Sequence, residues 1–159
     1  MWRTVQQLFV LMVCMGVPML GNTINAGSNW ATFTDGDLLA AIKMTQEGIA
    51  TCEQRLGVMN QAIDALDPEK MGQVNYNARS KRYRANREDY RSCLNNLNDI
   101  LDALIAERTK RVGGTVGQPE PGRSDARQTA SADLLRGLKG LIDDIPPLGA
   151  VSIDGRRVN

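Results

Sequence analysis

Histidine is absent from this 159-residue chain, and aromatic residues are scarce. The missing histidine removes the commonest general base and the commonest metal ligand. Two tryptophans, three tyrosines and two phenylalanines suit a helical bundle better than a β-sandwich or a large enzyme core. The net charge is only +1, so the overall charge does not indicate a nucleic-acid partner. The length corresponds to a single domain.

The sequence also lacks the motifs that carry common catalytic chemistry. It contains no GxSxG or HExxH motif, no glycine-rich phosphate loop and no Cys/His set with metal-ligand spacing. Asp143 and Asp144 are neighbouring carboxylates, but adjacent residues on a helix do not face a common site. We therefore expect a protein that is not an enzyme and that uses no cofactor, metal ion or small-molecule substrate.

The first segment, residues 1–26, has the pattern of a cleaved export signal. Arg3 gives it a positive start, and residues 8–20 form an apolar stretch that is too short to cross a bilayer comfortably. Cleavage after Ala26 would remove Cys14 and leave equal numbers of basic and acidic residues. The alternatives are an uncleaved anchor or a buried helix. Export predicts a periplasmic or extracellular protein.

A long amphipathic helix follows this signal. Thr34 and Asp37 have the spacing of a capping box at its start, with Phe33 and Leu38 at the two staple positions. Pro68 ends it, because a residue before proline disfavours the helical conformation. Its inward-facing positions alternate at coiled-coil spacing: Leu38, Ile42, Thr45, Ile49, Cys52, Leu56, Met59, Ile63 and Leu66.

A second helix is predicted from about Asn77 to Arg111, where Gly113 and Gly114 stop it. Its inward-facing positions, which we call the seam of the helix, alternate at the same spacing: Tyr83, Asn86, Tyr90, Cys93, Leu97, Ile100 and Leu104. Three further apolar residues widen this stripe beyond one narrow seam: Leu94, Leu101 and Ile105.

The two seams fit one antiparallel register. Facing residues in a helical hairpin have numbers with a constant sum; Cys52 and Cys93 give 145, and six further seam pairs give 145 or 146. The midpoint lies between Gly72 and Gln73, inside the expected turn. We therefore predict a Cys52–Cys93 disulfide, which would close a loop of about 40 residues and stabilise the fold by about 3–4 kcal/mol. An oxidising compartment would sustain it. The alternative is a pair of free, buried thiols.

Five cations lie in a basic run near the predicted hairpin tip: Arg79, Lys81, Arg82, Arg84 and Arg87. Cations are unfavourable at a helix N-terminus, so their presence there favours a role in binding a protein partner or an anionic membrane surface. The simpler interpretation is that neighbouring acids neutralise them on the surface: Asp64, Asp67, Glu69, Glu88 and Asp89.

The tail is predicted to contain a flexible linker over residues 112–130 and then a short amphipathic helix capped by Ser131. That helix either packs back onto the hairpin or binds a partner protein. At the C-terminus, Asp154 and Gly155 suit a turn between very short strands, and an extended terminus is the alternative. The apolar stripe of the tail helix comprises Leu134, Leu135, Leu138, Leu141, Ile142 and Ile145.

Together these features predict an all-α protein. Residues 1–26 are the signal, residues 27–111 a long, disulfide-linked, coiled-coil-like antiparallel hairpin, residues 112–130 the linker and residues 131–159 the helix and tail. This layout is similar to that of periplasmic accessory proteins of bacterial secretion and conjugation systems, although no motif is shared. We expect a structural or accessory subunit of an envelope assembly that acts by protein–protein contact or self-association. The alternatives are a periplasmic inhibitor or immunity-type binder, and a peripheral membrane protein that uses the basic run.

Overall fold

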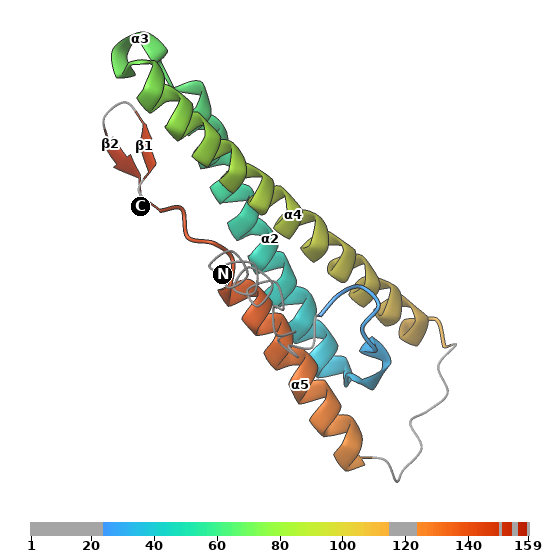
Figure 1. The fold of residues 1–159 in the computed structure, drawn as a ribbon. Helices are drawn as coiled ribbons and strands as arrows, with labels where there is room; N and C mark the ends of the chain where they lie inside the picture. The colour runs from blue at the N-terminus through green and yellow to red at the C-terminus, as the bar shows by residue number, and fades with distance from the viewer. Residues whose placement is uncertain (1–23, 115–123, 150, 154–155, 159) are drawn as a thin grey trace, which may run out of the picture.

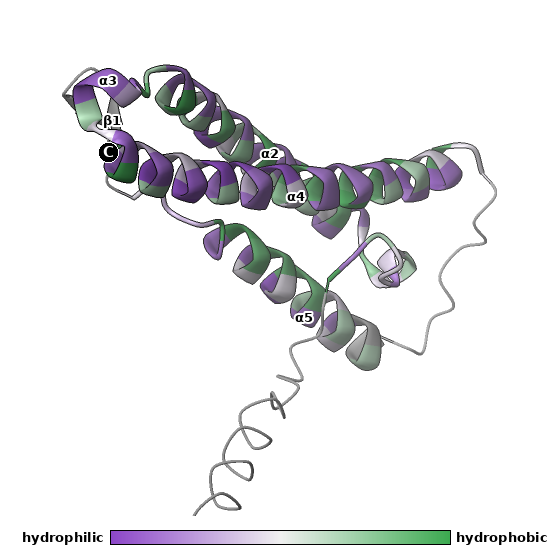
Figure 2. Cartoon of the chain, turned by 45° about the horizontal axis from the view of Figure 1, so that its top comes forward, coloured by the Kyte–Doolittle hydropathy of each residue, from purple (hydrophilic) through white to green (hydrophobic). Residues whose placement is uncertain are grey.

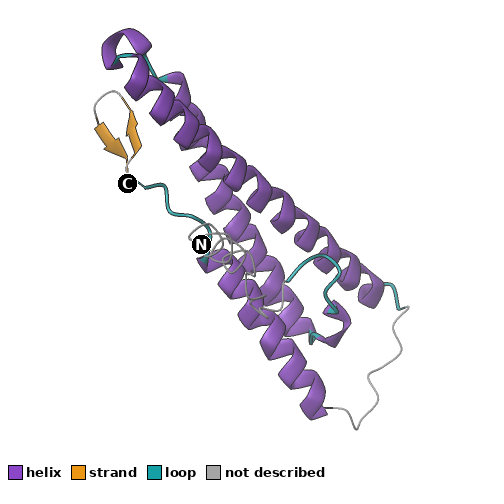
Figure 3. Ribbon diagram, in the orientation of Figure 1, coloured by secondary structure: helices purple, strands orange, loops and turns teal. Residues whose placement is uncertain are grey.

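The computed structural model describes residues 24–114, 124–149, 151–153 and 156–158. Long helices dominate it, so the prediction of a helical protein is confirmed (Figure 3). The predicted export signal lies outside the described residues apart from residues 24–26. The elements are η1 (Trp30–Thr32), α2 (Asp35–Asp64), α3 (Pro68–Met71), α4 (Gln73–Val112), α5 (Ser124–Asp143), β1 (Val151–Ile153) and β2 (Arg156–Val158).

Helices α2 and α4 lie side by side over their length, and α5 runs along one half of α2 (Figure 1). The predicted capping box is present at the start of α2. The Thr34 hydroxyl accepts a hydrogen bond from the Asp37 backbone N–H at 3.1 Å, and the Thr34 N–H donates to the Asp37 carboxylate at 3.1 Å. Both residues at the staple positions, Phe33 and Leu38, are buried.

The connection between the long helices differs in detail from the prediction. α2 ends at Asp64, and the short helix α3 follows because Asp67 accepts the Glu69 N–H at 2.9 Å and Pro68 suits a first helical position. α4 then begins at Gln73 rather than near Asn77. Gly72 allows this early start, since its φ of 76° lets the chain reverse at once.

Helix α5 also begins earlier than predicted, at Ser124 rather than Ser131. Ser131 is therefore not the cap of the tail helix. It lies inside α5, where it is buried and donates a hydrogen bond to the Asp37 carboxylate at 2.7 Å. Residues 124–130, expected to be part of the linker, are helical, and residues 115–123 lie outside the described residues.

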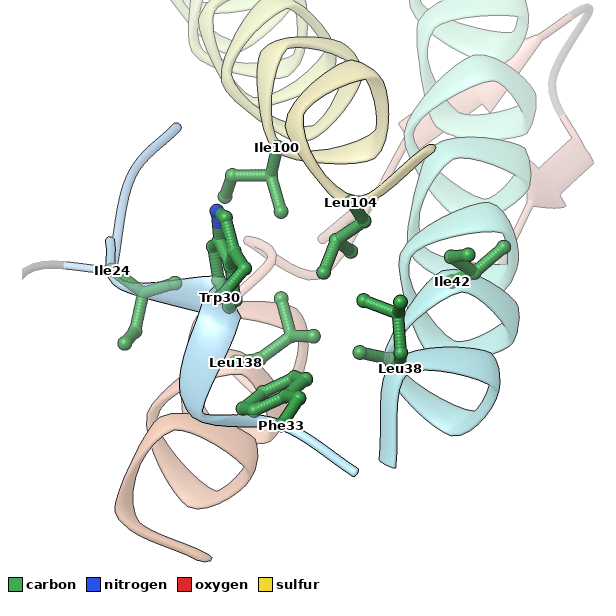
Figure 4. Packing of buried hydrophobic residues seen from close by; sticks show 9 residues of the cluster. Ile24, Trp30, Phe33, Leu38, Ile42, Ile100, Leu104 and Leu138 are labelled. Carbon is green, nitrogen blue, oxygen red and sulfur yellow. The ribbon is translucent and has the colours of Figure 1, made fainter. Parts of the chain in front are cut away.

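Two apolar clusters hold the helices together. The first joins η1, α2, α4 and α5, and within it Trp30 and Phe33 make an edge-to-face contact at 5.4 Å (Figure 4). Figure 2 shows apolar residues of α5 on the side that faces the other two helices. The buried members of the first cluster are Ile24, Trp30, Phe33, Leu38, Ala41, Ile42, Ile100, Leu104 and Leu138. Those of the second are Cys52, Met59, Ala62, Tyr83, Tyr90, Leu97, Ile145 and Val151.

The chain ends in two short strands. β1 and β2 pair antiparallel, with Val151 opposite Val158 and Ile153 opposite Arg156. The residues between them, Asp154 and Gly155, lie outside the described residues. β1 contacts α2, and the buried Val151 side chain belongs to the second cluster. The tail thus returns along α2 toward α3 (Figure 1).

Candidate functional site

The two cysteines predicted to pair lie opposite each other on α2 and α4. Their Sγ atoms are 2.9 Å apart, and both are thiols in this structure. Cys52 is fully buried and Cys93 is half-buried. The structure therefore brings the two sulfurs together without a covalent bond, and the disulfide stays a prediction.

Reactivity differs between these thiols. Burial raises the pKa of the Cys52 thiol to about 12, with further contributions from Cys93 and an opposing one from the Arg55 guanidinium. Cys52 is therefore protonated and unreactive at neutral pH, because the thiolate is the nucleophile. Cys93 is the less buried of the two residues.

The basic run does not form one patch. Arg79, Lys81 and Arg84 are exposed and form no ion pair with any residue that the structure describes. Arg79 and Lys81 are two residues apart, so they point to different sides of α4, whereas Lys81 and Arg84 share a side. Arg82 lies over the Tyr83 ring at 5.3 Å.

Arg87 behaves differently from the other cations of the run. Its Nη2 atom contacts the Glu88 carboxylate at 3.2 Å, while its Nε atom is buried without a hydrogen-bond partner in the described structure. Of the five acids expected to neutralise the run, Glu88 is the one paired with Arg87, and Asp67 instead pairs with Lys70 at 3.3 Å. The run is thus only partly neutralised.

The tail helix packs within the chain. Leu138 is fully buried in the first cluster and Ile145 is buried in the second. Four other residues of the predicted stripe are half-buried against one or both clusters: Leu134, Leu135, Leu141 and Ile142. Of the two alternatives derived from the sequence, the structure shows the intramolecular one. Leu138 and Ile145 are therefore covered within the chain, whereas the other four side chains remain partly exposed.

The segment after α5 is held by Arg55, which the sequence patterns did not single out, and by the hydroxyl of Tyr90, which they identified only as a seam residue. Arg55 of α2 donates to the carbonyl oxygens of Ile145 and Pro146, each at 2.7 Å. The Tyr90 hydroxyl of α4 lies 3.0 Å from the Pro146 carbonyl and 3.1 Å from that of Pro147. Burial raises the pKa of the Tyr90 phenol, so it remains a donor at neutral pH.

Arg111 fixes the opposite end of the helix pair. Its guanidinium donates to the carbonyl oxygen of Phe33 at 2.9 Å, to Asp35 at 2.9 Å and to Glu107 at 3.0 Å. Burial alone would lower the pKa of Arg111, but the hydrogen bonds with the two carboxylates outweigh it and raise the pKa. This single side chain joins the end of α4 to the start of α2 and to the η1 segment.

An open groove lies between α2 and α4 beside Arg111. It consists of two adjoining hollows of about 590 and 360 Å³, which share Arg108 and Val112. Three of the four large apolar side chains exposed in the described residues lie here: Leu39 is 48% exposed, Ile105 45% and Val112 83%. The groove is lined by Asp35, Leu38, Leu39, Ile42, Gln46, Ile105, Arg108, Thr109, Arg111, Val112 and Gly113.

This groove is a candidate binding surface on the part of the chain that the structure describes. Sequence periodicity had indicated only that the second helix carries apolar residues beyond its seam. Of these, Leu94 and Leu101 are half-buried against the clusters, whereas Ile105 remains in the groove. Across the described ranges, no group of three His, Cys, Asp or Glu side chains could hold a metal ion, and no helix is long and apolar enough to cross a membrane.

Comparison of the chain with protein-family models, with curated proteins and with solved structures gives no match.

Proposed function

We propose that this chain is an exported, non-enzymatic helical protein that acts by protein–protein contact, as a structural or accessory subunit of an envelope assembly. The open groove is the observation that carries the proposal. Its exposed Leu39, Ile105 and Val112 form an apolar surface next to a packed core, and grouped exposed apolar side chains are typical of protein interaction sites.

The proposal includes a disulfide-linked, coiled-coil-like hairpin as the rigid body that presents this surface. The 2.9 Å separation of Cys52 Sγ and Cys93 Sγ supports it, because only a small adjustment would be needed to join them. Oxidation would belong to the periplasmic or extracellular location that the apolar first segment predicts. A rigid hairpin presents a groove at a lower entropic cost of binding than a flexible one.

Site-specific photo-crosslinking in cells that export the protein tests this function. A photoreactive residue at Ile105 is expected to give discrete protein adducts, and the substitution Leu39→Asp is expected to abolish them. Val74 provides a matched control, since it is 82% exposed and apolar but lies at the start of α4, away from the groove. Adducts equally strong at Val74 and Ile105, or none at either, would contradict the proposal.

The stoichiometry of the captured complex separates the assembly subunit from an inhibitor or immunity-type binder. An inhibitor forms one tight complex with an enzyme in a one-to-one ratio, whereas an accessory subunit enters a larger complex or self-associates. Size-exclusion chromatography with light scattering on the crosslinked material distinguishes these results.

A second candidate function is peripheral attachment to an anionic membrane through the basic run. The exposed side chains of Lys81 and Arg84, which share one side of α4, favour it. Each cation near an anionic surface contributes about 1 kcal/mol. Flotation with liposomes that contain anionic lipid at low salt tests it: binding that disappears in Lys81→Gln/Arg84→Gln supports attachment, and no binding excludes it.

A further inference from the structure

We propose that the open groove binds a short amphipathic helix of a partner protein, and that a carboxylate on this helix pairs with Arg108. The inference rests on the proposed function above and adds the chemistry of the partner to it.

The geometry of the groove favours a helix as the occupant. On α2 its wall is formed by residues at helical spacing, Leu39, Ile42 and Gln46, and on α4 by Ile105 and Val112, one turn either side of Arg108. Two parallel stripes of this kind accept the ridge of a third helix. From residue 35 to residue 46, α2 rises by about 17 Å, which matches an occupant of about three turns.

One of the two helices that form the groove, α2, already packs against a helix of this chain. α5 packs against α2, and its Leu138 side chain lies in the cluster formed with Ile100 and Leu104 of α4. No residue of α5 or η1 lines the open groove, and the groove meets the first cluster only at Leu38 and Ile42. A helix in the open groove would complete a four-helix arrangement around α2 and α4.

Charge selects the kind of helix. At the end of the groove, Arg111 pairs with Asp35 at 2.9 Å and, behind the groove, with Glu107 at 3.0 Å, whereas Arg108 has no ion pair or hydrogen bond with any described residue. Gln46 and Thr109 are neutral. Among the lining residues, Arg108 is therefore the charged side chain without a partner of opposite charge, and an Arg–carboxylate pair beside apolar contacts would fix the orientation of the bound helix.

A second copy of the chain is a poorer occupant. The apolar stripe of α5 is already packed within the chain, and those of α2 and α4 form the two clusters. Two copies joined groove to groove by a twofold axis would bring their Arg108 side chains toward each other, which is unfavourable. The structure therefore favours a different protein with an acidic, apolar helix.

A matched pair of synthetic peptides tests this inference on the full processed chain. Each is a stapled helix of about 12 residues with leucines on one side, and the residue flanking that side is glutamate in one peptide and lysine in the other. The glutamate peptide is expected to bind about tenfold more tightly than the lysine peptide, as measured by fluorescence anisotropy. The variant Arg108→Glu is expected to reverse this preference, and Val74→Asp to leave it unchanged.

Equal binding of the two peptides, binding of neither, or an unchanged preference in Arg108→Glu would overturn the inference. A dimer in light scattering that dissociates in Leu39→Asp would identify a second copy as the occupant and overturn it as well. These results are separable from the proposed function. If Ile105 forms protein adducts in cells but the two peptides bind alike, the groove is a protein-binding site whose partner does not carry the predicted carboxylate.

Discussion

Replacing Arg111 by methionine tests whether one side chain holds the ends of the helix pair together. The substitution keeps much of the apolar stem and removes every donor of the guanidinium. It leaves the Phe33 carbonyl and the Glu107 carboxylate without the partners they have at 2.9 and 3.0 Å. The η1 segment, which contributes Trp30 to the first cluster, then loses the hydrogen bond that Arg111 donates to the Trp30 carbonyl at 3.3 Å.

The size of the effect follows from the exposure of each partner. The Asp35 side chain is 84% exposed, so its pair with Arg111 contributes little. The Glu107 side chain is only 12% exposed, and a hydrogen bond with a charged group at such a site contributes about 1.5–3 kcal/mol. With the Phe33 carbonyl added, we expect the free energy of unfolding to fall by about 3 kcal/mol.

Urea denaturation followed by Trp30 fluorescence measures this loss, because Trp30 is buried in the affected cluster. Arg136→Met is the matched control. Arg136 pairs with Asp133 at 2.9 Å, but its side chain is 79% exposed, so its loss should change stability by less than about 0.5 kcal/mol. If Arg111→Met and Arg136→Met unfold at the same urea concentration, the structural role assigned to Arg111 is wrong.

Three further predictions concern other contacts. Gly57→Ala should stabilise the chain by about 0.5–1 kcal/mol in urea denaturation, since a methyl group there meets no atom within 4 Å; Gly48→Ala should gain less, because its methyl carbon would lie 3.1 Å from Ile142. Tyr90→Phe should lower stability by about 1 kcal/mol and speed hydrogen exchange after α5, while unchanged exchange would refute the tie to the Pro146 and Pro147 carbonyls. Hydrogen bonds from Ser131 and Thr34 hold the pKa of Asp37 below 3.8 in the folded chain. The contribution of Asp37 to the free energy of unfolding is therefore present above pH 3.8 and is lost as the pH falls through the lower, folded-state pKa. Asp37→Asn should therefore show a shallower loss of stability in acid than the parent chain, as measured by urea denaturation at a series of pH values.

Much of the helical framework could be predicted from the sequence, because it depends on local and periodic signals. The Thr34–Asp37 capping box lies within four consecutive residues, and the pattern of the seam identified buried residues such as Tyr83 and Leu97. α3 was missed although its signals were present: Asp67 is a good N-cap residue and Pro68 a good first residue. The proline was interpreted only as a helix stop.

The groove and the hydrogen bonds of Arg55 and Arg111 could not be found in the same way. Arg55 and Arg111 bind backbone carbonyls far away in the sequence, and such contacts leave no periodic pattern. The groove depends on which apolar residues the chain itself covers. Ile105 and Leu101 look alike in the helical pattern, but only Ile105 remains in the groove after α5 and η1 have packed.

The register of α2 against α4 underlies every surface described above, and the linkage of its two cysteines is the most direct test of it. Under the proposed export, non-reducing peptide mass mapping of the processed chain recovered from the periplasm or medium measures this linkage. A single peptide pair joined through Cys52 and Cys93 within one molecule is the predicted result. Two free thiols, or a bond between separate molecules, would contradict the account.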